Sequence, residues 1–287
     1  MYRKIIYKIE YDTTVIDFLK RKNGYSARLI AELKRIEGGI TVNGELKRTI
    51  DELHQGEELR VLIPYGDTEL PPANLPLEVL YEDEDVLVVN KSAFTVCHPT
   101  RNHQGDTLAN AVSYYLNSKD IYCTFRTINR LDRDTTGCVA IALNKLAADK
   151  LASKVDKVYF AIVKGKIETA GTIDLPIFRP NPLNIKRCVD DRGQRAITHY
   201  EVIKGDENAT LLKIALETGR THQIRVHFSH IGHPLIGDTM YGIGDERINH
   251  QCLHCREVSF IHPITNERIT VTAPFPKEWN NILACKL

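Results

Sequence analysis

The chain has 287 residues, of which 43% are hydrophobic and 26% charged, as in an ordinary soluble globular protein. This length suits a main domain of about 200 residues with a smaller domain beside it. The formal net charge is only +1, from 38 basic and 37 acidic side chains, which excludes a basic field over the whole molecule and restricts any nucleic-acid surface to a local patch.

The N-terminal stretch "MYRKIIYKIEYD" carries charges every few positions and therefore lacks the apolar core of a signal peptide. No other stretch approaches the roughly 20 apolar residues of a membrane span. The cysteines are odd in number, without framework spacing, and several lie in apolar runs, which indicates reduced thiols. They are Cys97, Cys123, Cys138, Cys188, Cys252, Cys255 and Cys285. We therefore expect a cytoplasmic protein.

Residues 1–64 are predicted to form a small unit of their own. "TTVIDFLKRKNG" predicts a short helix ended by Asn23-Gly24, and Ser26 caps a second helix that Gly38-Gly39 stops. "ITVNGELK" predicts a hairpin that turns at Asn43-Gly44, and "ELRVLIP" predicts another strand. The apolar residues expected on the inner helix faces are Val15, Ile16, Phe18, Leu19, Leu29, Ile30, Leu33 and Ile36.

Basic side chains crowd this helical part, and charge alone would indicate solvated helix faces. They are Lys20, Arg21, Lys22, Arg28, Lys34 and Arg35. The order helix, helix, "ITVNG", strand over residues 12–62 resembles the S4 RNA-binding domain, whose paired helices present such residues to phosphates. That resemblance favours an RNA-binding role for residues 1–64.

A proline-rich linker is predicted at 65–76, and a larger domain at 77–287. From Leu77 onward, short apolar or alternating runs predict strands, with helices at "KLAADKLASKV" and "THQIRVHFSHIG". Strands joined by short turns with a few inserted helices indicate an α+β fold on a mixed, largely antiparallel sheet.

The first stretch that could carry chemistry is "NRLDRDTTG". Asp132 lies just before the buried strand 138–143, between Arg130 and Arg133, which would keep its carboxylate ionised. Such clusters are also common as structural ion pairs, so the residues alone leave both interpretations open.

The second stretch is "LETGRTHQIRVHFSHIGHPLIGD". We expect Thr221 to cap a helix whose Ile224, Phe228 and Ile231 face the core. His222, Arg225 and Ser229 share a more polar face, where a guanidinium could hold a carboxylate or phosphate at two points. A structural ion pair is the alternative.

Metal and nucleotide motifs are missing. The histidines of the second stretch spread around their helix without a carboxylate at zincin spacing, and "HQCLHC" lacks paired C-x-x-C spacing and suits a strand. There is no phosphate-binding glycine loop and no G-x-S-x-G elbow.

Together, "RLDRDTTG", "KVYFAIVKG" and "TGRTHQIRVHFSHIGHPLIGD" resemble the three signature stretches of the RluA family of pseudouridine synthases, in the family's order. "NKSAFTVCHP" and "ITVTAPFP" resemble flanking family segments, so that the resemblance spans about residues 77–276. Three positions depart: Asn129 replaces the usual histidine, Thr136 the usual serine, and Ser92-Ala93-Phe94 the end of an Asn-Lys-Pro-x-Gly element. These departures bear on substrate choice more than on activity.

The resemblance implies an enzyme that isomerises uridine to pseudouridine in structured rRNA or tRNA, as a monomer and without metal or other cofactor. It implies that Asp132 attacks C1′ or deprotonates C2′, that Arg225 pairs with it, and that Tyr159 stacks on the target base. The residues expected to contact substrate are Arg130, Arg220, His222, Gln223, Lys20, Arg21, Arg28, Lys34 and Arg35. An inactive RNA-binding homologue is the alternative, but it would have no reason to keep Asp132, Tyr159 and Arg225 together.

Overall fold

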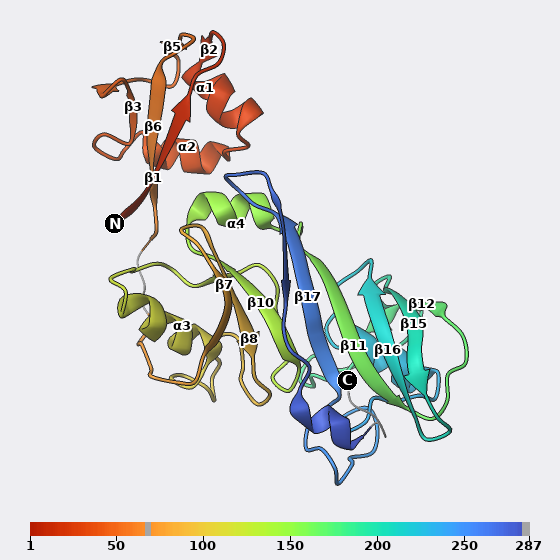
Figure 1. Ribbon diagram of the computed structural model, residues 1–287. Helices are drawn as coiled ribbons and strands as arrows, with labels where there is room; N and C mark the ends of the chain where they lie inside the picture. Colours follow the sequence, from red (N-terminus) through yellow and green to blue (C-terminus); the bar gives the residue numbers. More distant parts are fainter. Residues whose placement is uncertain (67–69, 283–287) are drawn as a thin grey trace.

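The computed structural model describes residues 1–66 and 70–282, and Figure 1 shows a small N-terminal part at one end of a larger one. Residues 67–69 of the predicted linker and Cys285 lie outside this range. The six cysteines within it are free. No helix in the described residues has the length and apolar character needed to cross a membrane.

Residues 1–64, here called the N-terminal module, contain a four-stranded sheet in the order β1-β6-β3-β4 with helices on one side. The hairpin turns at Asn43 and Gly44, whose φ values of 50° and 89° are the positive angles that such a tight turn requires. The module's elements are β1 (Tyr2–Lys8), β2 (Thr13–Thr14), α1 (Val15–Asp17), the π-helix η1 (Phe18–Lys22), α2 (Ala27–Leu33), β3 (Ile40–Val42), β4 (Glu45–Leu46), β5 (Glu52–Leu53) and β6 (Glu58–Pro64).

Two details of the module differ from the sequence analysis. No strand is expected at its N-terminus, whereas β1 pairs with β6 along its whole length. The alternation of apolar and polar residues that indicates a strand is hidden in β1, because the apolar Ile6 points outward and is 48% exposed. Ser26 does cap the second helix, its Oγ accepting from the Leu29 amide at 3.2 Å, but α2 ends at Leu33 and the chain turns before reaching Gly38.

The larger part is built on one sheet in the order β12-β15-β16-β11-β17-β10-β8-β7, with β18 beside β17 and β9 beside β10 (Figure 1). All pairs are antiparallel except β10 with β17. The strands are β7 (Glu78–Glu82), β8 (Val86–Lys91), β9 (Arg126–Thr127), β10 (Thr136–Ala142), β11 (Asp156–Lys164), β12 (Gly171–Asp174), β15 (Ile197–Gly205), β16 (Ala209–Leu216), β17 (Leu253–Ile261) and β18 (Arg268–Thr272), with β13 (Ile177–Phe178) and β14 (Cys188–Val189) as a separate pair. The predicted α+β fold is confirmed.

Four helices accompany this sheet: α3 (Leu108–Asn117), α4 (Lys145–Leu151), α5 (Gln223–His230) and the 3-10 helix η2 (Lys277–Asn281). The sequence analysis assigns no element to α3, although Thr107 and Asn110 form a reciprocal capping box at its start. α4 and α5 lie at the predicted places. Helix α3 packs Leu108, Val112 and Leu116 into the main core, which also contains the fully buried β10.

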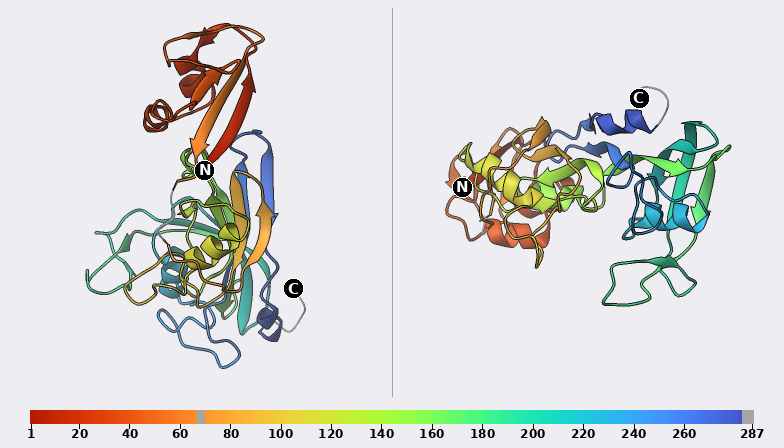
Figure 2. Two further views of the ribbon diagram at one scale, coloured as in Figure 1. Left: turned by 90° about the vertical axis from the view of Figure 1, so that its left-hand side faces the viewer. Right: turned by 90° about the horizontal axis from the view of Figure 1, so that it is seen from below.

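The module and the larger part meet around α4, as Figures 1 and 2 show from three directions. Leu146 of α4 is 0% exposed and belongs to the module's own apolar core. Lys145 Nζ lies 2.5 Å from Glu32 of α2, and Arg3 Nη2 lies 3.2 Å from the buried Asp85. The module is therefore seated on the larger part, in addition to being tethered by the linker.

Candidate active site

Asp132 lies in the loop between β9 and β10, and side chains rather than secondary structure shape that loop. Asn129 is buried. Its side-chain amide donates to the Cys138 carbonyl at 3.0 Å and accepts from the Ala140 amide at 2.8 Å, so it makes the backbone hydrogen bonds with β10 that a neighbouring strand would otherwise make. The Thr135 amide donates to the Asp132 carbonyl at 3.1 Å and closes a turn. These bonds present the Asp132 side chain, 31% exposed, at the entrance of β10.

Lys91, at the end of β8, hydrogen-bonds to the backbone of this loop. Its side chain is 1% exposed, and Nζ donates to the carbonyls of Ser92, Thr95 and Arg133 at 2.9, 2.7 and 2.8 Å. All three protons of the ammonium are thus used, and one of them anchors the residue next to Asp132. We infer that Lys91 positions the Asp132 loop.

Burial lowers the pKa of Lys91 to about 8 from its ordinary 10.5. Between these values the unfolded chain binds more protons, so this group adds stability as the pH rises. Between pH 8 and 10 the unfolding free energy of wild type should rise by about 2 kcal/mol relative to Lys91→Met, as measured by urea unfolding. Lys91→Met should also lower activity about tenfold or more, because the loop loses its anchor. Parallel stability curves, or unchanged activity, would contradict this role.

Asp132 faces Arg225 of α5, which a second carboxylate fixes in place. Arg225 is 6% exposed, and its Nε and Nη2 donate to the two oxygens of Asp238 at 2.7 and 2.9 Å. Its remaining Nη1 donates to Asp132 Oδ2 at 3.4 Å. The predicted pairing with Asp132 is therefore the longer, single contact, and the two-point pair is with Asp238.

The charges of this trio stabilise one another. Burial alone would lower the pKa of Arg225, but the bonds to Asp238 and the charge of Asp132 raise it above its usual value. Burial would raise the pKa of Asp238, yet Arg225 and the backbone amides of Met240 and Tyr241 lower it. Asp132 thus faces a guanidinium whose charge is permanent and whose orientation is fixed.

His222 and Tyr241 line the same side of the site. Tyr241 OH accepts from the Arg187 amide at 2.8 Å and lies 2.8 Å from His222 Nδ1, which fixes the orientation of the imidazole ring. The other ring nitrogen, His222 Nε2, lies 3.8 Å from Asp132 Oδ2. Arg225 stacks over the Tyr241 ring at 5.0 Å.

Tyr159 of β11 is 7% exposed and lies near enough to Asp132 to feel its charge. Burial, followed by the neighbouring Cys255 thiol and the charge of Asp132, raises its pKa well above the ordinary value, so the phenol is neutral at physiological pH. β10 approaches β17 closely here, because a Cβ on Gly137 would lie 2.2 Å from the Cys255 carbonyl oxygen. The structure thus brings Asp132, Tyr159 and Arg225 together from three separate elements.

The start of α5 differs from the prediction. His222, not Thr221, is the N-terminal cap residue, with φ +59° and no capping bond from its side chain. Ile224 and Phe228 are 4% and 0% exposed and face the core as predicted, whereas Ile231 follows the helix end and is 37% exposed. The left-handed backbone turns His222 toward Asp132, which a regular cap would not do.

Of the remaining predicted site residues, some are exposed and could reach a substrate, whereas Gln223 is buried and could not. Arg130 is exposed beside Asp132. Arg220 is exposed, and its Nε donates to the Arg195 carbonyl at 3.0 Å. Gln223 is 2% exposed and bonds to Thr218, the Arg220 amide, and the Ile197 and Thr198 oxygens. No polar atom of Gln223 is left for a substrate, and its role is to shape the turn before α5. The basic residues of the module that are predicted to bind RNA are all exposed: Lys20, Arg21, Arg28, Lys34 and Arg35.

The sequence analysis gives no role to Lys91, Asp238 or Tyr241. Asp238 is the last residue of the second family-like stretch, and its position after Gly237 is only a weak indication of a functional role. No local rule relates it to Arg225, because they meet only where the turn after α5 folds back. Lys91 lies in the family-like stretch "NKSAFTVCHP", but no local rule predicts its burial, since a lysine at a strand end is usually solvated.

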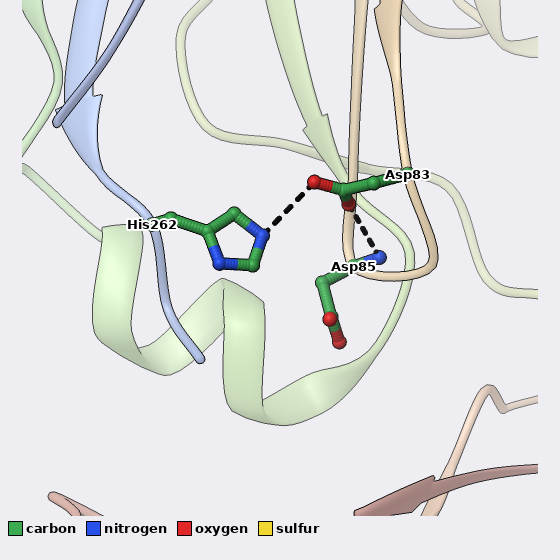
Figure 3. Close-up of side chains that lie close together, drawn as sticks. All are labelled: Asp83, Asp85 and His262. Carbon is green, nitrogen blue, oxygen red and sulfur yellow. Dashed lines mark hydrogen bonds and ion pairs between the residues drawn. The ribbon is translucent and has the colours of Figure 1, made fainter. Parts of the chain in front are cut away.

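One cluster of potential metal ligands exists among the described residues, at the module junction rather than in either histidine-rich stretch. Figure 3 shows Asp83 between His262 and Asp85; His262 Nε2 lies 2.9 Å from Asp83 Oδ2. All three groups already have donors within the protein. His262 Nδ1 accepts from the amides of Ile264 and Thr265. Asp83 accepts from the Tyr81 hydroxyl and two backbone amides, and Asp85 accepts from Asn144 and Arg3. The lone pairs that would bind a cation already accept these hydrogen bonds. The cluster therefore stabilises the junction between the module and the larger part rather than holding a metal ion.

Three of the histidines and cysteines weighed as metal ligands are poorly suited to hold a metal. Both ring nitrogens of His227 lie 2.9 Å from protein oxygens, of Thr198 and Leu175. In "HQCLHC", burial raises the pKa of the Cys252 and Cys255 thiols, which disfavours the thiolate that a metal needs. This stretch enters the predicted strand, β17, but residues 250–255 are all buried, so the expected alternation is absent there.

Comparisons with known proteins agree with this geometry. Residues 85–230 match the model of a family described as RNA pseudouridylate synthase. The uncharacterized RNA pseudouridine synthase YjbO of Bacillus subtilis is 38% identical over 91% of this chain and 95% of its own. Ribosomal large subunit pseudouridine synthase D of Pseudomonas aeruginosa is 39% identical over 85% of this chain and 82% of its own. A solved structure of human RNA pseudouridylate synthase domain containing 1 has a TM-score of 0.59 at 28% identity, and covers 72% of this chain and 86% of that protein.

Proposed function

The chain belongs to the RNA pseudouridylate synthase family, whose members isomerise uridine in RNA, and we propose that here Asp132 is the catalytic carboxylate and ribosomal RNA the substrate. The observation that carries the proposal is the arrangement at Asp132. A partly exposed carboxylate lies near a buried neutral phenol and beside a guanidinium that Asp238 holds rigidly. An ionised group next to a flipped nucleotide is what either role of Asp132 needs.

The reaction redraws bonds within one nucleotide. If Asp132 attacks C1′, the bond from C1′ to uracil N1 breaks; after the base rotates, C5 bonds to C1′ and displaces the carboxylate. If Asp132 acts as a base at C2′, it takes the C2′ proton while the bond from C1′ to N1 breaks, which leaves a double bond between C1′ and C2′; C5 of the rotated base then bonds to C1′ as the proton returns to C2′. On both routes C5 gives up its proton and N1 takes one up. Tyr159 would stack on the base near the C5 proton, and Arg225 would hold the Asp132 carboxylate in position. Neither route needs a redox partner or a second substrate.

Several further assignments belong to the same proposal. The relative named as a ribosomal large subunit enzyme supports rRNA over tRNA as the substrate. We propose that the protein acts as a monomer. We place the protein in the cytoplasm, with no metal or nucleotide cofactor.

The substrate is tested by mapping pseudouridines in rRNA and tRNA from cells with and without the gene. Loss of one or a few positions in large-subunit rRNA, restored by the wild-type gene but not by Asp132→Asn, is expected. Loss of a tRNA position alone would move the substrate to tRNA. Unchanged maps in both RNAs would contradict the ribosomal assignment.

We assign the N-terminal module, residues 1–64, to RNA binding as an S4-like domain. Four of its helical cations are exposed and have no ion pair among the described residues: Lys20, Arg28, Lys34 and Arg35. The other two are engaged, since Arg21 lies 3.2 Å from Asp17 and Lys22 lies 3.0 Å from Glu10. Exposed, unpaired cations on a module seated beside the catalytic part suit contacts to RNA phosphates.

Arg28 and Arg35 are the most informative pair, because Arg28 lies one helical turn before Glu32, which contacts the larger part, and Arg35 lies in the turn just after α2. Replacing both with glutamine should flatten the plot of log affinity against log salt by about 1.4–1.8 units, from two lost phosphate contacts. It should raise KM more than it lowers kcat.

The matched control is Lys4→Gln with Lys8→Gln, which removes two charges from the exposed face of β1. Equal slopes for the two double variants would mean that the helix faces are only solvated surface. Point variants are preferable to deletion, since deletion would expose Leu146 and leave Asp85 without Arg3.

A further inference from the structure

Phe94 has a strained backbone and an exposed ring in the loop that follows β8. Its φ is +63°, a left-handed value that bulky residues rarely adopt. Its side chain is 50% exposed, so core packing does not compensate for the strain. Strain that folding does not repay points to a role in binding or catalysis.

The buried ammonium of Lys91 fixes this loop against the Asp132 loop. Lys91 Nζ donates to the carbonyls of Ser92 and Thr95, on either side of Phe94, and to the carbonyl of Arg133 beside Asp132. The Phe94 turn and the Asp132 loop therefore share one buried ammonium. The ring is presented from a rigid base rather than from a mobile loop.

The other side of the ring meets the segment that supports Asp238. Phe94 contacts the His250 ring edge-on, with centroids 5.8 Å apart. The backbone of His250 packs closely against Gly237, whose added Cβ would lie 2.1 Å from the His250 carbonyl oxygen. The next residue, Gln251, donates to Thr135 in the Asp132 loop at 3.1 Å. Phe94 thus lies at the border of the candidate active site, with its ring open to solvent.

A free cation lies on the same border. Arg130 is exposed and makes no ion pair or hydrogen bond among the described residues. It lies two residues before Asp132, in the loop that Lys91 joins to the Phe94 turn. An exposed aromatic ring and an unpaired cation, each next to the Asp132 loop, are the combination with which proteins bind unpaired nucleotides.

We propose that Phe94 is a stacking platform for an unpaired base of the RNA substrate next to the target uridine. Stacking on a ring accepts any base, so Phe94 would hold the strand while the uridine is turned toward Asp132. This inference rests on the proposed function, because it takes Asp132 as the point where the uridine is bound. It adds a subsite contributed by the loop after β8.

The test measures steady-state kinetics on a hairpin transcript that contains a mapped target uridine. Phe94→Gly should raise KM about tenfold and change kcat little, because the stacking face is lost. Its thermal midpoint should stay equal or rise, since glycine adopts φ +63° freely. Phe94→Trp should keep KM near wild type. Tyr122→Gly, which removes an aromatic ring 49% exposed in another loop, is the matched control.

A second readout follows the base directly. In Asp132→Asn the transcript binds without turnover, so 2-aminopurine placed beside the target uridine reports stacking through quenched fluorescence. Adding Phe94→Gly should remove that quenching. An unchanged KM, an effect on kcat alone, or retained quenching would overturn the stacking role. If wild type itself forms no pseudouridine in the transcript, the proposed function fails instead.

Discussion

Replacing Asp132 by asparagine should abolish pseudouridine formation while changing RNA affinity by less than about tenfold. The amide has nearly the volume of the carboxylate, and the side chain is 31% exposed, so the loop should keep its shape. The substitution removes only the anion, which both candidate roles require. Binding energy supplied by the module and the remaining surface is not affected.

The measurement combines single-turnover pseudouridine formation with filter binding of the same RNA. Asp134→Asn is the matched control, because Asp134 lies in the same loop and pairs at 2.6 Å with the exposed Arg133 rather than with Arg225. We expect the control to keep most of the activity. Turnover by Asp132→Asn at about a tenth of the wild-type rate would rule out Asp132 as the essential group.

Arg225→Lys is expected to lower kcat by ~10²-fold or more, although it conserves the charge. Arg225 bonds to Asp238 through two nitrogens and to Asp132 through a third, and an ammonium on a shorter span cannot serve both carboxylates. The Asp132 carboxylate would lose its fixed neighbour. KM should change less, since Arg225 is 6% exposed and offers little surface to RNA.

The same change should destabilise the fold, because the fully buried Asp238 loses its two-point partner. A loss of about 2 kcal/mol would lower the thermal midpoint by about 4–8 °C, so activity must be compared well below that midpoint. Arg192→Lys is the control: Arg192 makes the same two-point contact to Asp190, at 2.8 and 2.7 Å, on the exposed surface. Near-normal activity in Arg225→Lys would show that Asp132 needs no fixed cation.

The sequence by itself determined most of the local structure and the chemistry to look for. Ser26, the Asn43-Gly44 turn and the apolar run of β10 act over a few residues, so their signals are complete within the sequence window that carries them. The spacing of Ile224 and Phe228 likewise fixed the inner face of α5. Family resemblance singled out Asp132, Tyr159 and Arg225, which composition and periodicity left open as ordinary ion pairs and core residues.

Only the tertiary structure decided which groups meet. Arg225 and Asp132 are 93 positions apart and Lys91 and Arg133 are 42 apart, so no helical or strand period relates them. Buried charges bond to whatever partners the folded chain brings within reach, and that choice depends on how β10, β11 and α5 converge. This is why Asp238, rather than Asp132, took the two-point contact with Arg225, and why the exposed-looking Lys91 became a buried anchor. The seating of the module on Leu146 has the same origin, because an apolar residue of α4 reveals its partner only when two separate units pack together.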